Sequence, residues 1–387
     1  MPGAASLPVV LTHSSPTPAE RRGQHALEFT AAILIAGIWI GYVFWQSAVR
    51  KVAADFAPFY CAGKILRGEG PHALYDWAII QEQQVRLFPE RRTTLPFIRP
   101  PFYALALSPF SLLSPGRALL VWLSLNIIAL VAALFLSARA MKMEFSALSW
   151  HAAIFFPALY AVFNRQDVPL VLLLAAAASW LLAQDRPFRA GLALSLCEIK
   201  FNLLLLVPLC FLTRKNWRAL EGFAAGSSVL LLISTLLVGP AGIVAYARML
   251  IQRTPPQMEF PQRTANVASL VGDTWVQVPL ILLVAAAVVT AARRLPQLEA
   301  VSAAWLGSLL IAPHVFISDY LLALPALLLL ARLSPVCLFS SLVVLFPVTP
   351  IVMTRGDRFL LLTPQMVLIC LAGAAFFRAK SWKTAAH

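Results

Sequence analysis

One carboxylate, Asp55, lies just beyond the end of the first long apolar segment, residues 30 to 49. The stretch from 50 to 100 that contains it is mostly polar, aromatic or proline, and Phe59 and Tyr60 follow closely. An acid at a membrane boundary is a candidate general base toward the hydroxyl of a lipid-borne substrate, with Tyr60 as a candidate contact. The alternative is a solvated carboxylate or the N-cap of a following helix.

Two basic residues, Lys200 and Arg99, lie within or directly beside apolar stretches. Lys200, with Glu198, interrupts the apolar stretch 190 to 212, and a charge at that depth is costly unless it has a function. Lys200 is therefore a candidate cation for the phosphate of an anionic lipid, and the alternative is a surface-exposed kink. Arg99 precedes two prolines that hold the backbone extended, which can present its guanidinium to phosphate, although proline is also common at helix starts for structural reasons.

Polar side chains also gather in the short links between apolar segments. Asn164, Gln166 and Asp167 fit turn chemistry, and equally fit a sugar pocket, where hydroxyls need paired donors and acceptors. His314 and Asp319 lie where one span ends and the next begins, so His314 is either a structural hydrogen bonder or a catalytic or substrate-binding group. Arg263, Asn266 and Arg355 are further candidates for phosphate or sugar contacts.

The sequence lacks the motifs of several common classes of enzyme and binding protein. The sequence has no GxxxxGK[ST], GxGxxG, HExxH or GxSxG segment, and its five cysteines show no CxxC or Cys/His ligand spacing. We therefore predict no metal site and no cofactor. A sugar carried by a lipid would require neither.

The elements that position these residues are membrane helices. In 387 residues, 60% are hydrophobic and only 12% are charged, which indicates an all-α polytopic membrane protein. We count about twelve crossings, within a range of roughly 10 to 13. The segments are 30 to 49, 116 to 138, 146 to 163, 168 to 184, 188 to 200, 201 to 213, 219 to 239, 275 to 292, 298 to 313, 319 to 331, 335 to 353 and 359 to 377. The piece 101 to 113 is short and bounded by prolines, so we expect it to be re-entrant or interfacial.

The net charge of +14 is explained by topology rather than by nucleic acid, because most basic residues lie in the links. A cytoplasmic N-terminus places most of them inside: Arg139, Lys142, Arg186, Arg189, Arg214, Lys215, Arg218, Arg293, Arg294, Arg332, Arg378, Lys380 and Lys383. The candidate site residues then lie on the outer side. This count requires two half-length helices that meet near Lys200. A rival count, with 101 to 113 as a full span and 188 to 213 as one helix, moves four of those charges outward.

We expect one transmembrane domain over residues 26 to 380, between a disordered cytoplasmic tail at 1 to 25 and a short cytoplasmic tail at 381 to 387. Two long outer loops, 50 to 100 and 240 to 274, belong to it. In the first, residues 56 to 66 and 75 to 88 fit short amphipathic, interfacial helices.

Six motifs in register resemble glycosyltransferase family 87 over roughly residues 50 to 330. They are Asp55-Phe56-Ala57-Pro58-Phe59-Tyr60 with Leu74-Tyr75; Pro100-Pro101-Phe102-Tyr103-Ala104-Leu105; Ser108-Pro109-Phe110; Asn164-x-Gln166; Lys200 before a helix that ends in Arg214-Lys215-Asn216-Trp217-Arg218; and Pro313-His314 with Asp319-Tyr320. One departure is Arg165, where the family usually has glycine.

The resemblance implies a GT-C-like enzyme that passes a hexose, often mannose, from a polyprenyl-phosphate donor to a lipid or glycan acceptor outside the membrane. It implies Asp55 as catalytic base, Lys200 as a donor-phosphate contact and His314 as an auxiliary group. The expected location is the inner (plasma) membrane, with the active site facing the periplasm or exterior. The alternative is a lipid-linked-sugar flippase or secondary transporter that uses Glu198, Lys200 and Asp167 as intramembrane charges.

Overall fold

The structure is a computed structural model that describes residues 56–89, 94–142, 167–251, 266, 274–313, 315, 317–323 and 325–326. Every regular element in these ranges is helical. In chain order the elements are α2 (Phe56–Gly68), η1 (Pro71–Ala73), α3 (Trp77–Leu87), α4 (Pro101–Leu107), η2 (Ser108–Leu112), α5 (Pro115–Ala140), α7 (Val168–Ala183), α8 (Pro187–Ser195), η3 (Leu196–Leu203), α9 (Val207–Thr213), α10 (Trp217–Ile251), α12 (Thr274–Arg294), α13 (Gln297–Ile311) and η4 (Ile317–Ala323). The predicted spans 30 to 49, 146 to 163, 335 to 353 and 359 to 377, and both predicted tails, lie outside the described residues.

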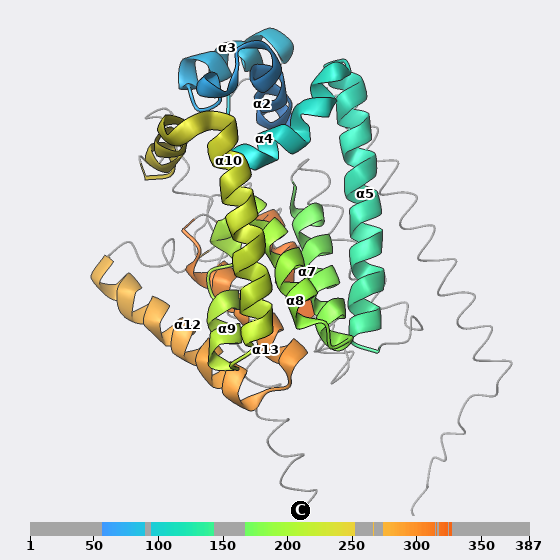
Figure 1. The fold of residues 1–387 in the computed structure, drawn as a ribbon, viewed down its shortest axis with the longest axis vertical. Coiled ribbons are helices and arrows are strands. Elements are labelled where there is room, and N and C mark those ends of the chain that lie inside the picture. The colour runs from blue at the N-terminus through green and yellow to red at the C-terminus, as the bar shows by residue number, and fades with distance from the viewer. Residues whose placement is uncertain are drawn as a thin grey trace, which may run out of the picture.

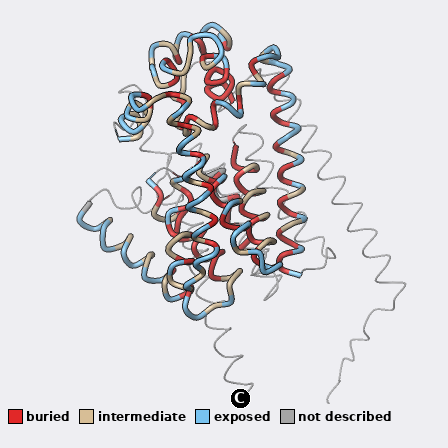
Figure 2. Tube along the Cα trace, in the orientation of Figure 1, coloured by how far each residue is buried: buried red, intermediate tan, exposed pale blue. Residues whose placement is uncertain are grey.

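Three helices of the described part are long and apolar enough to cross a membrane: Pro115–Ala140, Trp217–Ile251 and Trp275–Arg294. Their outward faces expose large apolar side chains, such as Leu236 at 77% and Leu283 at 65%, as Figure 2 shows for α10 and α12. Such surfaces are stable against lipid and unfavourable in water. The described part is thus that of an all-helical, multi-pass membrane protein, while twelve crossings remain our prediction.

The helices of the bundle run alternately toward its two ends (Figure 1). The lower end in that view gathers the last turns of α5, α7, α9 and α12 and the first turns of α8, α10 and α13. Basic residues lie in or beside these turns: Arg139, Arg186, Arg189, Arg214, Lys215, Arg218, Arg293 and Arg294. Arg214 also donates hydrogen bonds to the carbonyls of Ala292 and Leu295, which fixes the end of α9 to the α12–α13 link. This basic end is the one that the sequence places in the cytoplasm.

The apolar stretch 188 to 213 does not form one helix. Lys200 adopts φ −126° and ψ 62° inside η3, so the chain turns between α8 and α9. The predicted break near Lys200 is therefore confirmed, and the rival single helix is wrong. The helices on either side, α8 with nine residues and α9 with seven, are shorter than the predicted segments 188 to 200 and 201 to 213. The piece 101 to 113 is likewise short, with α4 followed by η2.

A cap of short helices covers the other end of the bundle (Figure 1). Both helices predicted in the first outer loop are present, as α2 and α3, and Asp76 caps α3 by accepting from the backbone N–H groups of Ala78 and Ile79. α2 differs from a surface amphipathic helix because nine of its thirteen residues are buried. The reason is aromatic packing: the Phe56 ring lies 5.8 Å from that of Trp122 and 6.4 Å from that of Phe110, centroid to centroid.

Small residues let α8 and α10 pack in direct backbone contact. A Cβ on Gly191 would lie 2.1 Å from the Ala219 carbonyl oxygen, and one on Gly222 would lie 2.0 Å from the Phe188 carbonyl oxygen. Close approach through glycine is a common way in which membrane helices associate. These contacts hold α8, and hence the start of the turn at Lys200, against α10.

Gly191→Ala is therefore expected to destabilise the protein by about 1–3 kcal/mol, because overpacking forces the two backbones apart. The measurement is the midpoint of thermal unfolding of detergent-purified protein. Gly116→Ala in α5, where a Cβ meets nothing within 4 Å, is the control and should leave the midpoint unchanged or higher. Equal midpoints for both variants would contradict the packing argument.

Candidate functional site

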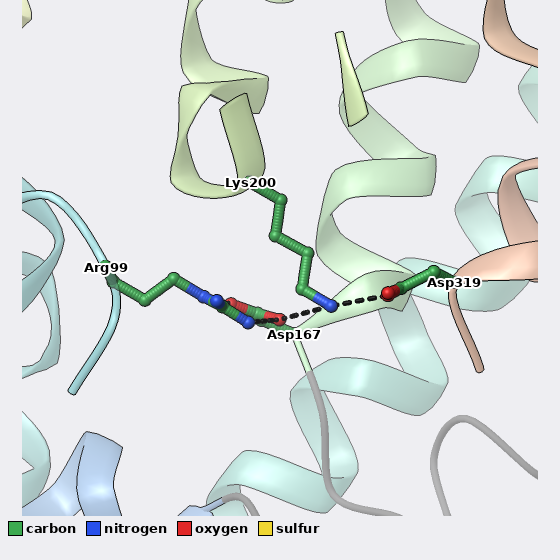
Figure 3. A network of polar contacts seen from close by, with 4 residues as sticks. All are labelled: Arg99, Asp167, Lys200 and Asp319. Carbon is green, nitrogen blue, oxygen red and sulfur yellow. Dashed lines mark hydrogen bonds and ion pairs between the residues drawn. The ribbon is translucent and has the colours of Figure 1, made fainter. Parts of the chain in front are cut away.

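Four charged side chains from distant parts of the chain meet inside the protein (Figure 3). Arg99 binds Asp167 with both ends of its guanidinium, Nε to Oδ2 at 2.7 Å and Nη2 to Oδ1 at 3.0 Å. Lys200 Nζ lies 2.5 Å from Asp319 Oδ1 and 3.6 Å from Asp167 Oδ1. Asp167 therefore lies between two cations, and Lys200 between two carboxylates. We call these four residues the buried charge network.

Each member comes from a different segment. Arg99 lies in the irregular segment before α4, where the Tyr75 hydroxyl donates to its carbonyl oxygen at 2.8 Å. Asp167 directly precedes α7, and Lys200 lies at the break in η3. Asp319 lies in the first turn of η4. Every member of the network thus lies at or beside a helix end or a helix break. At such positions irregular backbone is tolerated inside a membrane protein when it is buried within the protein.

The network is compact, buried and neutral in sum. Arg99 is 8% exposed, Asp167 0%, Lys200 5% and Asp319 2%, and two cations face two carboxylates. Burial alone would lower the pKa of Arg99, but the charge of Asp167 outweighs it and raises that pKa. Burial alone would raise the pKa of Asp167, but Arg99 and then Lys200 lower it. Asp167 therefore stabilises the folded protein at any pH above the ordinary Asp pKa. This stabilisation is lost as the pH falls through the lowered pKa that Asp167 has in the folded state.

Two other candidates, Tyr60 and Asn266, lie within the described residues. The Tyr60 hydroxyl donates to the Leu113 carbonyl oxygen at 2.8 Å, so Tyr60 joins α2 to the segment before α5. Asn266 is buried, and its Nδ2 donates to the carbonyl oxygens of Ala312 and Pro313, at 2.6 and 3.1 Å. Asn266 thereby ties the loop that we predict to be the second outer one to the end of α13. The remaining candidates lie outside the described residues: Asp55, Asn164, Gln166, Arg263, His314 and Arg355.

Glu198 and Lys200 are neighbours in sequence but have different partners. The Ser227 hydroxyl of α10 donates to the Glu198 carboxylate, whereas Lys200 turns toward Asp167 and Asp319. The break in the backbone at Lys200 separates the directions of the two side chains. Of the three charges that we considered for a transporter, Lys200 and Asp167 belong to one network and Glu198 does not.

Sequence reasoning did not single out Tyr103 or Tyr246. Both hydroxyls are buried without a hydrogen-bond partner among the described residues. Tyr103 lies four positions after Arg99, within the motif Pro100-Pro101-Phe102-Tyr103-Ala104-Leu105, and its place in that motif is a signal that could have identified it. Tyr246 lies beyond the kink of α10 at Gly239 and offered no such signal.

Three apolar helices long enough to cross a membrane, packed in the described part of the chain with other helices around the buried charge network, define the class: a multi-pass membrane protein. The profile of glycosyltransferase family 87 matches residues 97–325, more than half of the chain. The chain therefore belongs to glycosyltransferase family 87, and is a membrane glycosyltransferase. The matched segment contains all four members of the buried charge network and begins after Asp55. No curated protein and no solved structure matches the chain.

Proposed function

We propose that this enzyme transfers a hexose, with mannose as the first candidate, from a polyprenyl-phosphate donor to a lipid or glycan acceptor. The reaction takes place on the outer face of the inner (plasma) membrane and inverts the anomeric centre. The observation that carries the proposal is the buried charge network, which lies within the family segment. Asp167 directly precedes α7, whose last turn lies at the basic end, so the network lies toward the opposite end of the bundle. By the positive-inside rule that end faces outward.

Asp55 is the general base of the proposed reaction. It accepts the proton of the acceptor hydroxyl as the oxygen attacks the anomeric carbon, and the bond from that carbon to the donor phosphate breaks. The leaving phosphate departs as an anion and needs no acid, so one carboxylate suffices where glycoside hydrolases use two. In the sequence Asp55 directly precedes α2, whose aromatic residues pack against α4 and α5.

The two described cations have different roles in this proposal. Arg99 is held by Asp167 through two hydrogen bonds, the geometry in which arginine binds a carboxylate most firmly. Lys200 is a flexible point charge shared between Asp167 and Asp319. We therefore assign the donor-phosphate contact to Lys200, and give Arg99 and Asp167 the role of positioning it. Arg263 and Arg355 are further candidates for the phosphate, and His314, Asn164 and Gln166 for the sugar or acceptor.

The test is sugar transfer by detergent-purified protein from labelled polyprenyl-phosphate mannose to a membrane-lipid acceptor extract. Detergent removes the two compartments, so a flippase or transporter would give no product, although the broken helix at Lys200 also suits that class. We expect a mannosylated lipid to form. Absence of product with every polyprenyl-phosphate hexose tried would overturn the proposal.

A further inference from the structure

Tyr103 lies inside the protein with its hydroxyl unused. Its side chain is 4% exposed, and the hydroxyl has no hydrogen-bond partner among the described residues. Its backbone N–H donates to the Pro100 carbonyl oxygen at 3.0 Å, in the first turn of α4. A buried phenol without a partner costs free energy, and phenylalanine would fill the same space without that cost. Packing therefore explains the ring but not the hydroxyl.

The Tyr103 ring and the Arg99 guanidinium contact the same aromatic residue. The Phe59 ring meets that of Tyr103 edge to face, with centroids 5.9 Å apart, and the Arg99 Cζ lies 5.5 Å from the Phe59 centroid. Asp167 and Arg99 are also close enough to the Tyr103 phenol to interact with it electrostatically. The unused hydroxyl thus belongs to the surroundings of the buried charge network.

A second buried hydroxyl, that of Tyr246, is linked to Arg99 through Tyr75. The Tyr246 ring lies 5.2 Å, centroid to centroid, from the ring of Tyr75, whose hydroxyl donates to the Arg99 carbonyl oxygen. The Tyr246 hydroxyl has no partner among the described residues. Two buried phenols whose hydroxyls have no partner among the described residues therefore lie near Arg99. Because nearly every buried polar group in a protein is paired, such a pattern is typical of a site that is completed by a polar ligand.

We propose that the Tyr103 hydroxyl binds the sugar-phosphate headgroup of the lipid donor, as a hydrogen-bond donor to one of its oxygens. The inference rests on the proposed function and adds a residue to it. The cations of the network are already balanced by its carboxylates. An uncharged hydrogen-bonding group beside them, such as a phenol hydroxyl, can recognise the headgroup without adding an uncompensated charge. Tyr103 is thus a donor-binding residue, and α4 is the element that presents it.

Tyr103→Phe is the test, because it removes the hydroxyl and nothing else. We expect kcat/KM for polyprenyl-phosphate mannose to fall about 10- to 100-fold, the usual effect of losing a hydrogen bond to a charged or highly polar group. The midpoint of thermal unfolding without ligand should stay unchanged or rise. The matched control is Ser137→Ala in α5, which also removes a buried, unpartnered hydroxyl, but at the basic end of the bundle. It should leave both readouts at the wild-type level.

A second readout does not depend on transfer. Undecaprenyl phosphate, with or without mannose on the phosphate, is added in detergent and the rise in unfolding midpoint is measured. A rise that Tyr103→Phe loses with both lipids supports a contact to the phosphate, and one lost only with the mannosylated lipid supports a contact to the sugar.

The outcomes separate this inference from the proposed function. If the wild-type protein transfers no sugar, but its lipid-induced rise is lost in Tyr103→Phe, the proposed function fails and the contact stands. The inference is overturned if Tyr103→Phe keeps kcat/KM within about twofold of wild type and shows the same rise. It is also overturned if the variant unfolds at a lower temperature without ligand and its activity loss follows that instability.

Discussion

Asp55→Asn protein is expected to fold normally and to transfer sugar about 100- to 10,000-fold more slowly than wild type, the usual effect of losing a general base. Asparagine keeps the shape of the side chain and cannot accept the proton of the acceptor hydroxyl. The measurement is the initial rate of transfer from labelled polyprenyl-phosphate mannose, with protein amounts matched by size-exclusion chromatography. Retained donor binding in the same variant would show that the loss is in the chemical step.

The control for Asp55→Asn is the same substitution in a link at the basic end of the bundle. Asp185, in the link between α7 and α8, is exposed and has φ +53°, a conformation that asparagine tolerates well. Asp185→Asn should keep the wild-type rate. A rate for Asp55→Asn close to that of this control would remove Asp55 from the mechanism, and with it the assignment of the reacting group.

The second large effect is expected at Asp167. Asp167→Asn leaves Arg99 buried without its carboxylate and takes one carboxylate from Lys200, which costs about 3–5 kcal/mol when the pair is buried. The expected result is a lower unfolding midpoint, a larger aggregated fraction and little transfer. An exposed ion pair, Arg218 with Glu221 at 3.4 Å, is the control, and Glu221→Gln should change none of these.

A paired replacement separates stability from function at this site. Arg99→Met with Asp167→Leu removes both members of the bidentate pair and leaves Lys200 with Asp319. Because apolar replacement of a whole buried pair is often neutral, we expect the double variant to regain most of the midpoint that Asp167→Asn loses. Transfer should stay low, since Lys200 loses its positioning partner. Additive losses in the double-mutant cycle would show that Arg99 and Asp167 act independently, against the structure.

The sequence predicted the features that follow from the free-energy cost of a charge or a proline in an apolar segment. Charges in apolar stretches are costly, so Lys200 stood out, and the break in the helix there was predicted from charge placement and helix length. The short form of 101 to 113 followed from its prolines. The family was predicted from motifs in register, and the profile match confirms it.

Pairing could not be predicted, because it depends on three-dimensional contacts. Arg99 and Asp167 are 68 positions apart and Lys200 and Asp319 are 119 apart, and neither spacing marks a pair. Glu198, beside Lys200 in sequence, was the more obvious partner and is bound to Ser227 instead. The burial of α2 depends on Trp122 and Phe110, which follow it by more than a helix length in sequence. The Tyr103 hydroxyl has no hydrogen-bond partner among the described residues, and this too depends on which side chains surround it in three dimensions.

The order of signs in the buried charge network also bears on how the chain is made. From N- to C-terminus its members are a cation, an anion, a cation and an anion: Arg99, Asp167, Lys200 and Asp319. A ribosome therefore delivers each cation before the carboxylate that binds it most closely, while Asp167 is already present when Lys200 enters the membrane. Among these four residues, the nascent protein never holds more than one surplus charge. Insertion can then proceed helix by helix, with the final carboxylate neutralising the assembly.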